Sequence, residues 1–300
     1  MFEWNISVQK MLDCVEENLT GPLTLDVLAG RLNYSPYYCT RQFHKYAGIS
    51  LRNYIRLRKV SSAVIDLRDT GQRILDIAVR YGFSSQEAFT RSFKTAYGMT
   101  PNAYRKMPRP LPLLVKRNVF NPYYLGLMET NMKEDLSKNI TVSIQVLPAH
   151  KFIGIRHNDA PGYFEFWKKE EEKYGRDRCD EVDGVLSSIK SFNGMIGGWF
   201  YQDGKRGYIY GIEVPANYTG EVPEGMESLL IREAQYAVFH HPPYDYARME
   251  KSVWEGLNKM AEAWKPSEHG YEWDDSLPTY QRHNPPEYGQ AIIRPLKKRK

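Results

Sequence analysis

An internal repeat in the first hundred residues limits the possible folds of this 300-residue chain more than any other feature. The run Thr40-Arg41-Gln42-Phe43 recurs fifty residues later as Thr90-Arg91-Ser92-Phe93, and Gly48 recurs at the same offset as Gly98. A repeat of about this length indicates one supersecondary unit that is used twice. The first third of the chain is therefore expected to hold two copies of a small motif.

Each copy is predicted to form two short helices joined by a tight turn. In the first copy Thr24 caps one helix, and Ser35 with Pro36 starts a second helix that ends at Gly48. Serine and threonine are favoured N-caps, proline is favoured at the first helical position, and glycine is favoured just after the last one. The second copy repeats this plan over residues 74–98.

Residues 51–69 contain no glycine or proline and predict one helix between the copies. Two short helices with basic and polar residues early in the second form a helix-turn-helix, which places that second helix in the DNA major groove. A 19-residue helix is about 28 Å long, and successive major grooves on one face of DNA lie about 34 Å apart. The two copies could therefore reach successive grooves. The alternative is a purely structural bundle, which leaves the equivalent arginines 41 and 91 without a role.

Charge divides the chain in the same way. Residues 1–110 hold 16 Lys+Arg against 9 Asp+Glu, whereas residues 111–300 hold 25 against 27. A basic segment joined to a slightly acidic one is typical of a polyanion-binding module attached to something else.

Composition excludes several classes of protein. With 42% hydrophobic and 26% charged residues, wholesale disorder is excluded. No apolar run is long enough for a transmembrane helix or a signal core, so we expect a cytoplasmic protein with no membrane partner. The three cysteines are too far apart for a disulfide framework or a metal site.

Two runs in the first third of the chain carry a family resemblance. They are LTLDVLAGRLNYSPYYCTRQFHKYAG and RILDIAVRYGFSSQEAFTRSFKTAYGMTPNAYR, and together they resemble the AraC/XylS-type DNA-binding domain over residues 23–106. The resemblance implies a bacterial-type transcription regulator, an activator, with a DNA-binding domain over residues 1–107 and double-stranded promoter DNA as its partner. The positions that face the bases would be Tyr37, Thr40, Arg41, Gln86, Glu87 and Arg91.

The chemistry of these side chains suits base recognition. Arginine can donate two hydrogen bonds to guanine, glutamine can pair with adenine, and glutamate can accept from cytosine. The alternative for Arg41 and Arg91 is a contact with phosphate or with an acidic neighbour only.

Three prolines between residues 108 and 112 mark a linker, which we place at residues 108–140. Residues 123–139 are either a short helix or a tether. After the linker, alternating apolar residues predict strands and apolar residues at helical spacing predict helices. The predicted strands are 141–146, 151–157, 198–203, 208–215 and 290–295, and the predicted helices are 163–174 and 248–264.

The pattern of strands and helices recurs at an offset of 85 residues, where AHKFI at 149–153 resembles AQYAV at 234–238. This predicts two β-α-β-β units in tandem with pseudo-two-fold symmetry. The expected fold is thus an all-α double helix-turn-helix domain followed by an α+β domain over residues 141–297.

Three segments of this second half carry a second resemblance. YIYGIEVP, VPEGMESLLIREAQYAVFHH and PPEYGQAIIRPLKK are similar to the GyrI-like effector-binding domain. The resemblance implies an aromatic small-molecule pocket in the groove between the two units, with a carboxylate that pairs with lipophilic cations. In this chain the run LPTYQRHNPP has Tyr280 or Gln281 where the family carries that glutamate. The departure favours a neutral or polar effector.

We expect aromatic side chains to line this pocket and a carboxylate elsewhere to replace the missing one. The candidates are Trp199, Tyr201, Tyr210, Trp273 and Tyr280, with Glu165 and Glu213 as carboxylates. The alternative is that the aromatic residues are core and that Glu165 lies on a solvated helix face.

No catalytic motif stands out in the sequence. There is no Ser–His–Asp order, glycine-rich phosphate loop or metal-spaced His/Cys set, so we expect no enzyme activity, no cofactor and no metal. The leading hypothesis is a DNA-binding regulator that senses a small, aromatic or amphipathic molecule and contacts RNA polymerase. The alternatives for the second half are a ligand-free protein-contact module or a small-molecule hydrolase.

Overall fold

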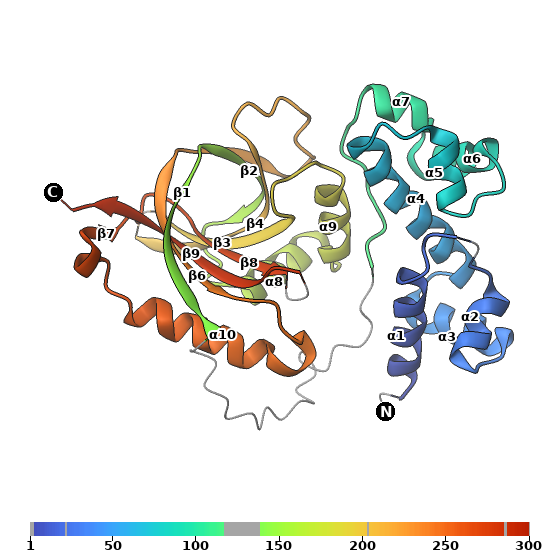
Figure 1. The fold of residues 1–300 in the computed structure, drawn as a ribbon, viewed down its shortest axis with the longest axis horizontal. Helices are drawn as coiled ribbons and strands as arrows, with labels where there is room; N and C mark the ends of the chain where they lie inside the picture. The colour runs from blue at the N-terminus through green and yellow to red at the C-terminus, as the bar shows by residue number, and fades with distance from the viewer. Residues whose placement is uncertain (1–2, 22, 117–138, 203, 285–286, 300) are drawn as a thin grey trace. The chain divides into compact units, whose positions relative to one another are not determined.

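The chain divides into a helical unit and a sheet unit (Figure 1). This computed structural model describes residues 3–21, 23–116, 139–202, 204–284 and 287–299. Unit 1 comprises Met1–Asn121 and Cys179–Lys190, and unit 2 comprises Pro122–Arg178 and Ser191–Lys300. No helix among the described residues is long and apolar enough to cross a membrane.

Unit 1 consists of helices. They are α1 (Glu3–Glu16), α2 (Leu25–Leu32), α3 (Pro36–Ala47), α4 (Leu51–Asp69), α5 (Ile74–Arg80), α6 (Gln86–Tyr97), α7 (Pro101–Lys106) and α9 (Cys179–Ser187). The two predicted helix pairs and the helix between them are confirmed: Thr24 and Ser35 cap α2 and α3, α4 spans the predicted residues 51–69, and α5 and α6 lie within the predicted residues 74–98.

Each helix-turn-helix has its own core, and α4 contributes to both. The first core contains Phe43 and Tyr54, and the second contains Phe93 and Tyr104. All four rings are fully buried, and they occupy equivalent positions in the repeat. The repetition in the sequence is therefore a repetition of packing.

The turn inside each copy contains a residue in the left-handed conformation, and this residue differs between the two copies. Asn33 has φ 55° in the first turn, and its counterpart Gly82 has φ 70° in the second. A Cβ atom on Gly82 would lie 2.3 Å from the carbonyl oxygen of Gly21. Asparagine tolerates the left-handed region, so the first turn can use it. At the second turn the backbone of Gly21 leaves no room for any side chain.

A reciprocal exchange tests this difference. We expect Asn33→Gly to change the free energy of unfolding of unit 1 by less than about 1 kcal/mol, and Gly82→Asn to lower it by about 1–3 kcal/mol. Chemical denaturation followed by helical circular dichroism measures both changes. Equal losses in the two variants would show that the contact with Gly21 has no energetic weight.

Unit 1 also contains two segments that were not predicted to belong to it. Residues 108–116, expected as the start of the linker, pack with Leu111 and Leu113 in the second core. Helix α9 packs beside them: a Cβ atom on Gly184 would lie 2.0 Å from the carbonyl oxygen of Leu113, and the Leu111 amide donates to the Ser188 hydroxyl. The rest of the predicted linker, residues 117–138, lies outside the described residues.

Unit 2 is built on one antiparallel sheet. Its elements are β1 (Thr141–Leu147), β2 (His150–His157), α8 (Tyr163–Tyr174), β3 (Met195–Gln202), β4 (Lys205–Pro215), β5 (Glu227–Ile231), β6 (Ala234–His241), α10 (Tyr246–Ala263), the 3-10 turn η2 (Pro266–His269), β7 (Tyr271–Trp273), β8 (Thr279–Asn284) and β9 (Gly289–Lys298). The strand order is β1-β6-β9-β8-β3-β4-β2-β5, and β7 pairs with β9. The helical and sheet parts of the predicted fold are confirmed.

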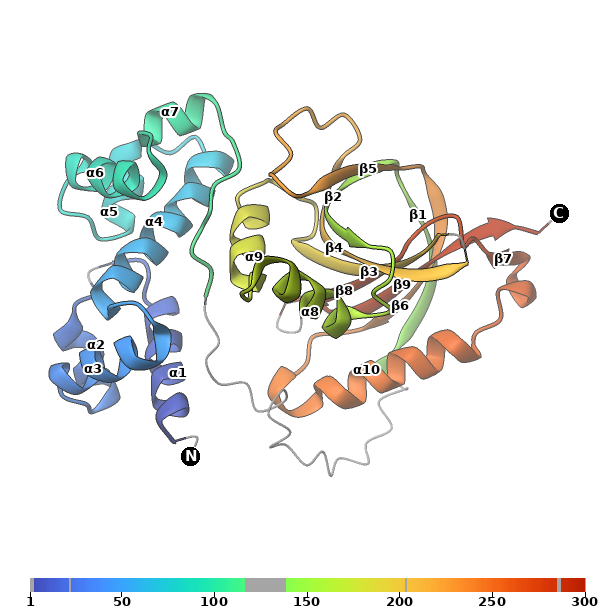
Figure 2. The same cartoon turned by 180° about the vertical axis from the view of Figure 1, so that it is seen from behind.

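The two faces of the sheet bury different residues, as strand periodicity requires. On β6, Tyr236 and Val238 lie in a core that includes Tyr280, whereas Ala237 and Phe239 lie in a core with α10. Helices α8 and α10 lie on the same side of the sheet (Figure 2), and residues from both line one cavity there.

His241, at the end of β6, is expected to make this unit sensitive to acid. It is 2% exposed, its Nδ1 lies 2.7 Å from the Pro242 oxygen, and no described atom hydrogen-bonds its Nε2. Burial lowers the pKa of His241 below its ordinary value. The unfolded chain therefore takes up a proton before the folded one does, and stability falls as the pH drops below about 6.5.

His241→Asn removes the titration and keeps a side-chain amide near the Pro242 oxygen. We expect this variant to lose about 1 kcal/mol less stability than the parent between pH 7 and pH 5. The exposed His269, changed to asparagine, is the control and should leave the pH dependence unchanged. Thermal unfolding at a series of pH values gives the comparison, and identical profiles for His241→Asn and the parent would contradict the prediction.

Candidate nucleic-acid interface and ligand cavity

Helix α3 exposes the three positions predicted to face the bases. The Ser35 hydroxyl accepts from the Tyr38 amide and caps the helix, which Pro36 begins. Tyr37, Thr40 and Arg41 are exposed, while Cys39 and Phe43 on the opposite face are buried. The helix is thus anchored by one face and presents the other to solvent.

Helix α6 has the same construction. Ser85 caps it, Phe89 and Phe93 are buried, and the three predicted residues Gln86, Glu87 and Arg91 are exposed. A hydrogen bond with the Ser85 side chain holds the pKa of Glu87 below its ordinary value, and the charge of Arg91 adds to this. Glu87 therefore stays ionised at neutral pH and can act only as an acceptor.

The Arg41 and Arg91 guanidinium groups form no hydrogen bond or ion pair with any residue in the described ranges. Each has five N–H donors that can pair in a fork with guanine or with phosphate. The two groups stand at equivalent points of two helices joined by the 19-residue α4.

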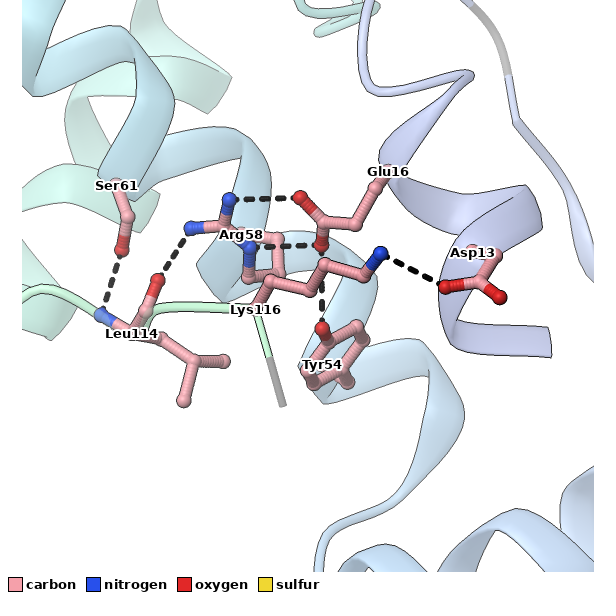
Figure 3. Close-up of polar contacts among 7 residues, drawn as sticks. All are labelled: Asp13, Glu16, Tyr54, Arg58, Ser61, Leu114 and Lys116. Atoms are coloured by element: carbon pink, nitrogen blue, oxygen red, sulfur yellow. Dashed lines mark hydrogen bonds and ion pairs between the residues drawn. The ribbon is translucent and has the colours of Figure 1, made fainter. Parts of the chain in front are cut away.

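A polar cluster around Arg58 links α4 to α1 and to the segment after α7 (Figure 3). Arg58 on α4 donates through Nε and Nη2 to Glu16 of α1, at 2.8 and 2.7 Å, and through Nη1 to the carbonyl oxygen of Leu114. The Leu114 amide donates to the Ser61 hydroxyl at 2.9 Å. Arg58 thus joins α1, which packs in the first core, to the segment that carries Leu113 of the second core.

Two helix-turn-helix units on one chain, each presenting an exposed arginine, define a DNA-binding protein. Residues 28–107 match the protein family described as a helix-turn-helix domain. The Tn10 transposon protein TetD from Escherichia coli is 40% identical over 99 residues, which are 33% of this chain and 72% of TetD. The multiple antibiotic resistance protein MarA from Escherichia coli K12 is 40% identical over 100 residues, which are 33% of this chain and 79% of MarA. The chain belongs to the AraC/XylS family of DNA-binding transcription regulators.

Among solved structures, SAV2435 bound to tetraphenylphosphonium is similar with a TM-score of 0.36 and 16% identity. The match covers 52% of this chain and 94% of that one.

Unit 2 contains a cavity of about 490 Å³ between α8, α10 and the sheet. Six aromatic side chains and six charged or polar ones share its walls. The walls are formed by Pro161, Gly162, Tyr163, Phe164, Glu165, Met195, Gly197, Trp199, Arg206, Tyr208, Tyr210, Glu250, Trp254, Asn258, Gln281 and His283. The rings of Trp199 and Trp254 are stacked with centroids 6.1 Å apart.

The cavity brings together three of the seven residues predicted to bind a ligand: Glu165, Trp199 and Tyr210. Tyr201 is 53% exposed and lies outside its lining, as does Trp273, which contacts Trp264 and Arg294.

Tyr280 and Glu213 also lie outside the cavity, because they point to the opposite face of the sheet. Both are buried there around His150, whose Nε2 is 3.0 Å from the Tyr280 hydroxyl and 3.4 Å from Glu213 Oε1. Arg282 pairs with Glu213 Oε2 at 3.0 Å. The Glu213 carboxylate is therefore neutralised within the protein and does not face the cavity.

Helix α10 supplies a wall of the cavity that was not predicted from the sequence. Glu250, Trp254 and Asn258 are spaced by four residues and so fall on one face of the predicted helix. That spacing was available as a signal. Glu250 is 8% exposed and accepts from the Tyr244 hydroxyl, and it lies 3.1 Å from His283 Nε2. Among the described residues, no group of three His, Cys, Asp or Glu side chains is arranged to hold a metal ion.

Proposed function

We propose that this regulator reads its promoter through Tyr37, Thr40 and Arg41 in one major groove and through Gln86, Glu87 and Arg91 in the next. The exposure of all six side chains on the two second helices supports this assignment. Each arginine is free of protein partners among the described residues, so it can pair with a base without breaking an existing contact.

We further infer that unit 2 senses a small aromatic molecule in the cavity between α8 and α10. The cavity itself carries this conclusion: its volume of about 490 Å³ falls in the range of small-molecule sites, and six aromatic side chains line it. Regulation would follow if the bound molecule favours one arrangement of the protein over another.

The strand order supports the proposal that unit 2 is a GyrI-like domain of two tandem units. The order follows the same plan when it is read inward from either edge of the sheet. From one edge it is β1-β6-β9-β8 and from the other it is β5-β2-β4-β3, so β6, β8 and β9 occupy the same places as β2, β3 and β4. The helices α8 and α10 follow β2 and β6 respectively, at corresponding places in this order. The cavity lies where the two halves meet, at β3 and β8.

A thermal-unfolding screen of the full chain against neutral, cationic and anionic aromatic compounds tests the sensor. A compound that binds only the folded state stabilises it by about 2.7 kcal/mol at a hundred times its Kd, and so raises the Tm of unit 2. We expect Trp254→Ala to abolish the shift. Phe192→Ala, which removes an exposed ring that does not line the cavity, should leave it unchanged. A shift that survives Trp254→Ala would place the binding site elsewhere.

A further inference from the structure

Two arginine side chains near the cavity lie on tryptophan rings. The guanidinium carbon of Arg206 is 4.9 Å from the ring centroid of Trp199, and that of Arg294 is 3.9 Å from the centroid of Trp273. Neither guanidinium forms a hydrogen bond or an ion pair with any described residue. Stacking on an aromatic face fixes the position of such a group but leaves all its N–H donors available.

The strand register brings both arginines to the face of the sheet that bears the cavity. Arg206 on β4 is paired with Tyr201 on β3, two residues after the lining residue Trp199. On β9, Ile292 is paired with the lining residue Gln281, and Arg294 follows two residues later. Residues two apart on a strand point to the same face. Arg206 itself lines the cavity, and Arg294 lies on the same face of the sheet, outside that lining.

The two positive charges act on each other. Burial lowers the pKa of Arg294, and the nearby charge of Arg206 lowers it further. Asp275, Glu262 and Tyr201 act in the opposite direction, but neither carboxylate forms an ion pair with Arg294. A pair of neighbouring cations that form no ion pair with any described residue favours an anion between them.

One of the two carboxylates that line the cavity already has partners. Glu250 accepts from Tyr244 and lies at hydrogen-bond distance from His283. The other, Glu165, is exposed at the start of α8. Neither carboxylate forms an ion pair with Arg206 or Arg294, so both guanidinium groups remain open to an external anion.

We propose that the effector is an aromatic acid, whose rings occupy the cavity beside Trp199 and Trp254 and whose anionic group is held by Arg206 and Arg294. This inference rests on the proposed sensor function. It also gives Tyr201 and Trp273 a place near the ligand: Tyr201 is the strand partner of Arg206, and the Trp273 ring positions Arg294. Arginine suits this task because its planar fork matches a carboxylate.

Calorimetric titration of the full chain with three naphthalene compounds of similar shape tests the charge preference. The compounds are 2-naphthoate, the neutral 2-naphthamide and the cationic 2-naphthylmethylammonium. We expect 2-naphthoate to bind at least about tenfold more tightly than the other two, since a hydrogen bond to a charged group contributes about 1.5–3 kcal/mol. Arg206→Met and Arg294→Met should each bring 2-naphthoate to within about twofold of 2-naphthamide.

Lys205→Met provides the matched control, because it removes an exposed positive charge next to Arg206 and should preserve the preference. If 2-naphthamide or 2-naphthylmethylammonium binds as tightly as 2-naphthoate, the cavity remains a sensor site and the acid proposal is overturned. The same holds if the preference survives both arginine variants. If none of the three binds, both the acid proposal and the sensor function of this cavity are overturned.

Discussion

Replacing both Arg41 and Arg91 by alanine is expected to weaken binding to the preferred DNA site by two to four orders of magnitude, with a much smaller loss on random DNA. Each arginine that forms two hydrogen bonds to guanine contributes about 1–3 kcal/mol of discrimination. The two side chains lie on different helices and share no partner, so their contributions should add. The preferred site is first obtained by selection from a random pool, and affinities follow from fluorescence anisotropy.

Lys45→Ala is the matched control for this experiment. Lys45 is an exposed cation in the last turn of α3, away from the start of the helix, which is the part proposed to contact the bases. Its loss should weaken binding to both DNAs to a similar and smaller extent, because a phosphate contact carries no sequence information. If Arg41→Ala and Arg91→Ala behave like Lys45→Ala, the arginines contact only the backbone. The salt concentration is held fixed throughout, since every phosphate contact makes affinity depend on salt.

The helices of unit 1 could be predicted because their signals are local. A serine or threonine cap, a proline in the first position and a glycine after the last all lie within one turn of the helix end that they define. The repeat then shows the same cap and glycine pattern a second time, which supports the prediction for both copies. The correspondence of Asn33 with Gly82 illustrates this, because both adopt the left-handed conformation at the same point of the repeat.

The cavity could be predicted only in part, because its lining depends on which way each strand faces. Tyr280 and Gln281 are neighbours, and from the sequence either could stand at the position where the similar family carries its glutamate. In the structure Gln281 lines the cavity while Tyr280 lies in the opposite core. The same alternation separates Tyr210 from Glu213 on β4. Because successive side chains of a strand point to opposite faces of the sheet, only the register decides which of two neighbours faces the cavity.

Helix α9 could not be predicted to belong to unit 1, because the residues before and after it in the chain belong to unit 2. Its place depends on contacts with residues distant in sequence. Arg68 on α4 donates to the carbonyl oxygen of Ser187 at 3.0 Å, and Gly184 allows the close approach to Leu113. Such long-range complementarity leaves no local pattern.

The second large effect is expected at the polar cluster around Arg58. Glu16→Leu should lower the free energy of unfolding of unit 1 by about 3–5 kcal/mol, because it leaves the Arg58 guanidinium buried without its carboxylate. The side chains of Arg58 and Glu16 are only 13% and 16% exposed, so water cannot replace the lost partner fully. Although burial would lower the pKa of Arg58, the hydrogen bond and charge of Glu16 raise it above its ordinary value, so the group stays charged.

The double variant Glu16→Leu/Arg58→Met separates this penalty from a general loss of packing. Replacing both partners of a buried ion pair by apolar side chains is often close to neutral, so the double variant should recover most of the stability that Glu16→Leu loses. Urea denaturation of both single variants and of the double variant completes the cycle. The surface pair Lys116–Asp13, about 40% exposed on each side, is the control, and Asp13→Ala should cost less than about 1 kcal/mol. A double variant no more stable than Glu16→Leu would mean that Leu114 and Ser61 depend on Arg58 itself. In that case the hydrogen bond from the guanidinium to the Leu114 carbonyl oxygen, and not the ion pair with Glu16, contributes most to the stability of this cluster.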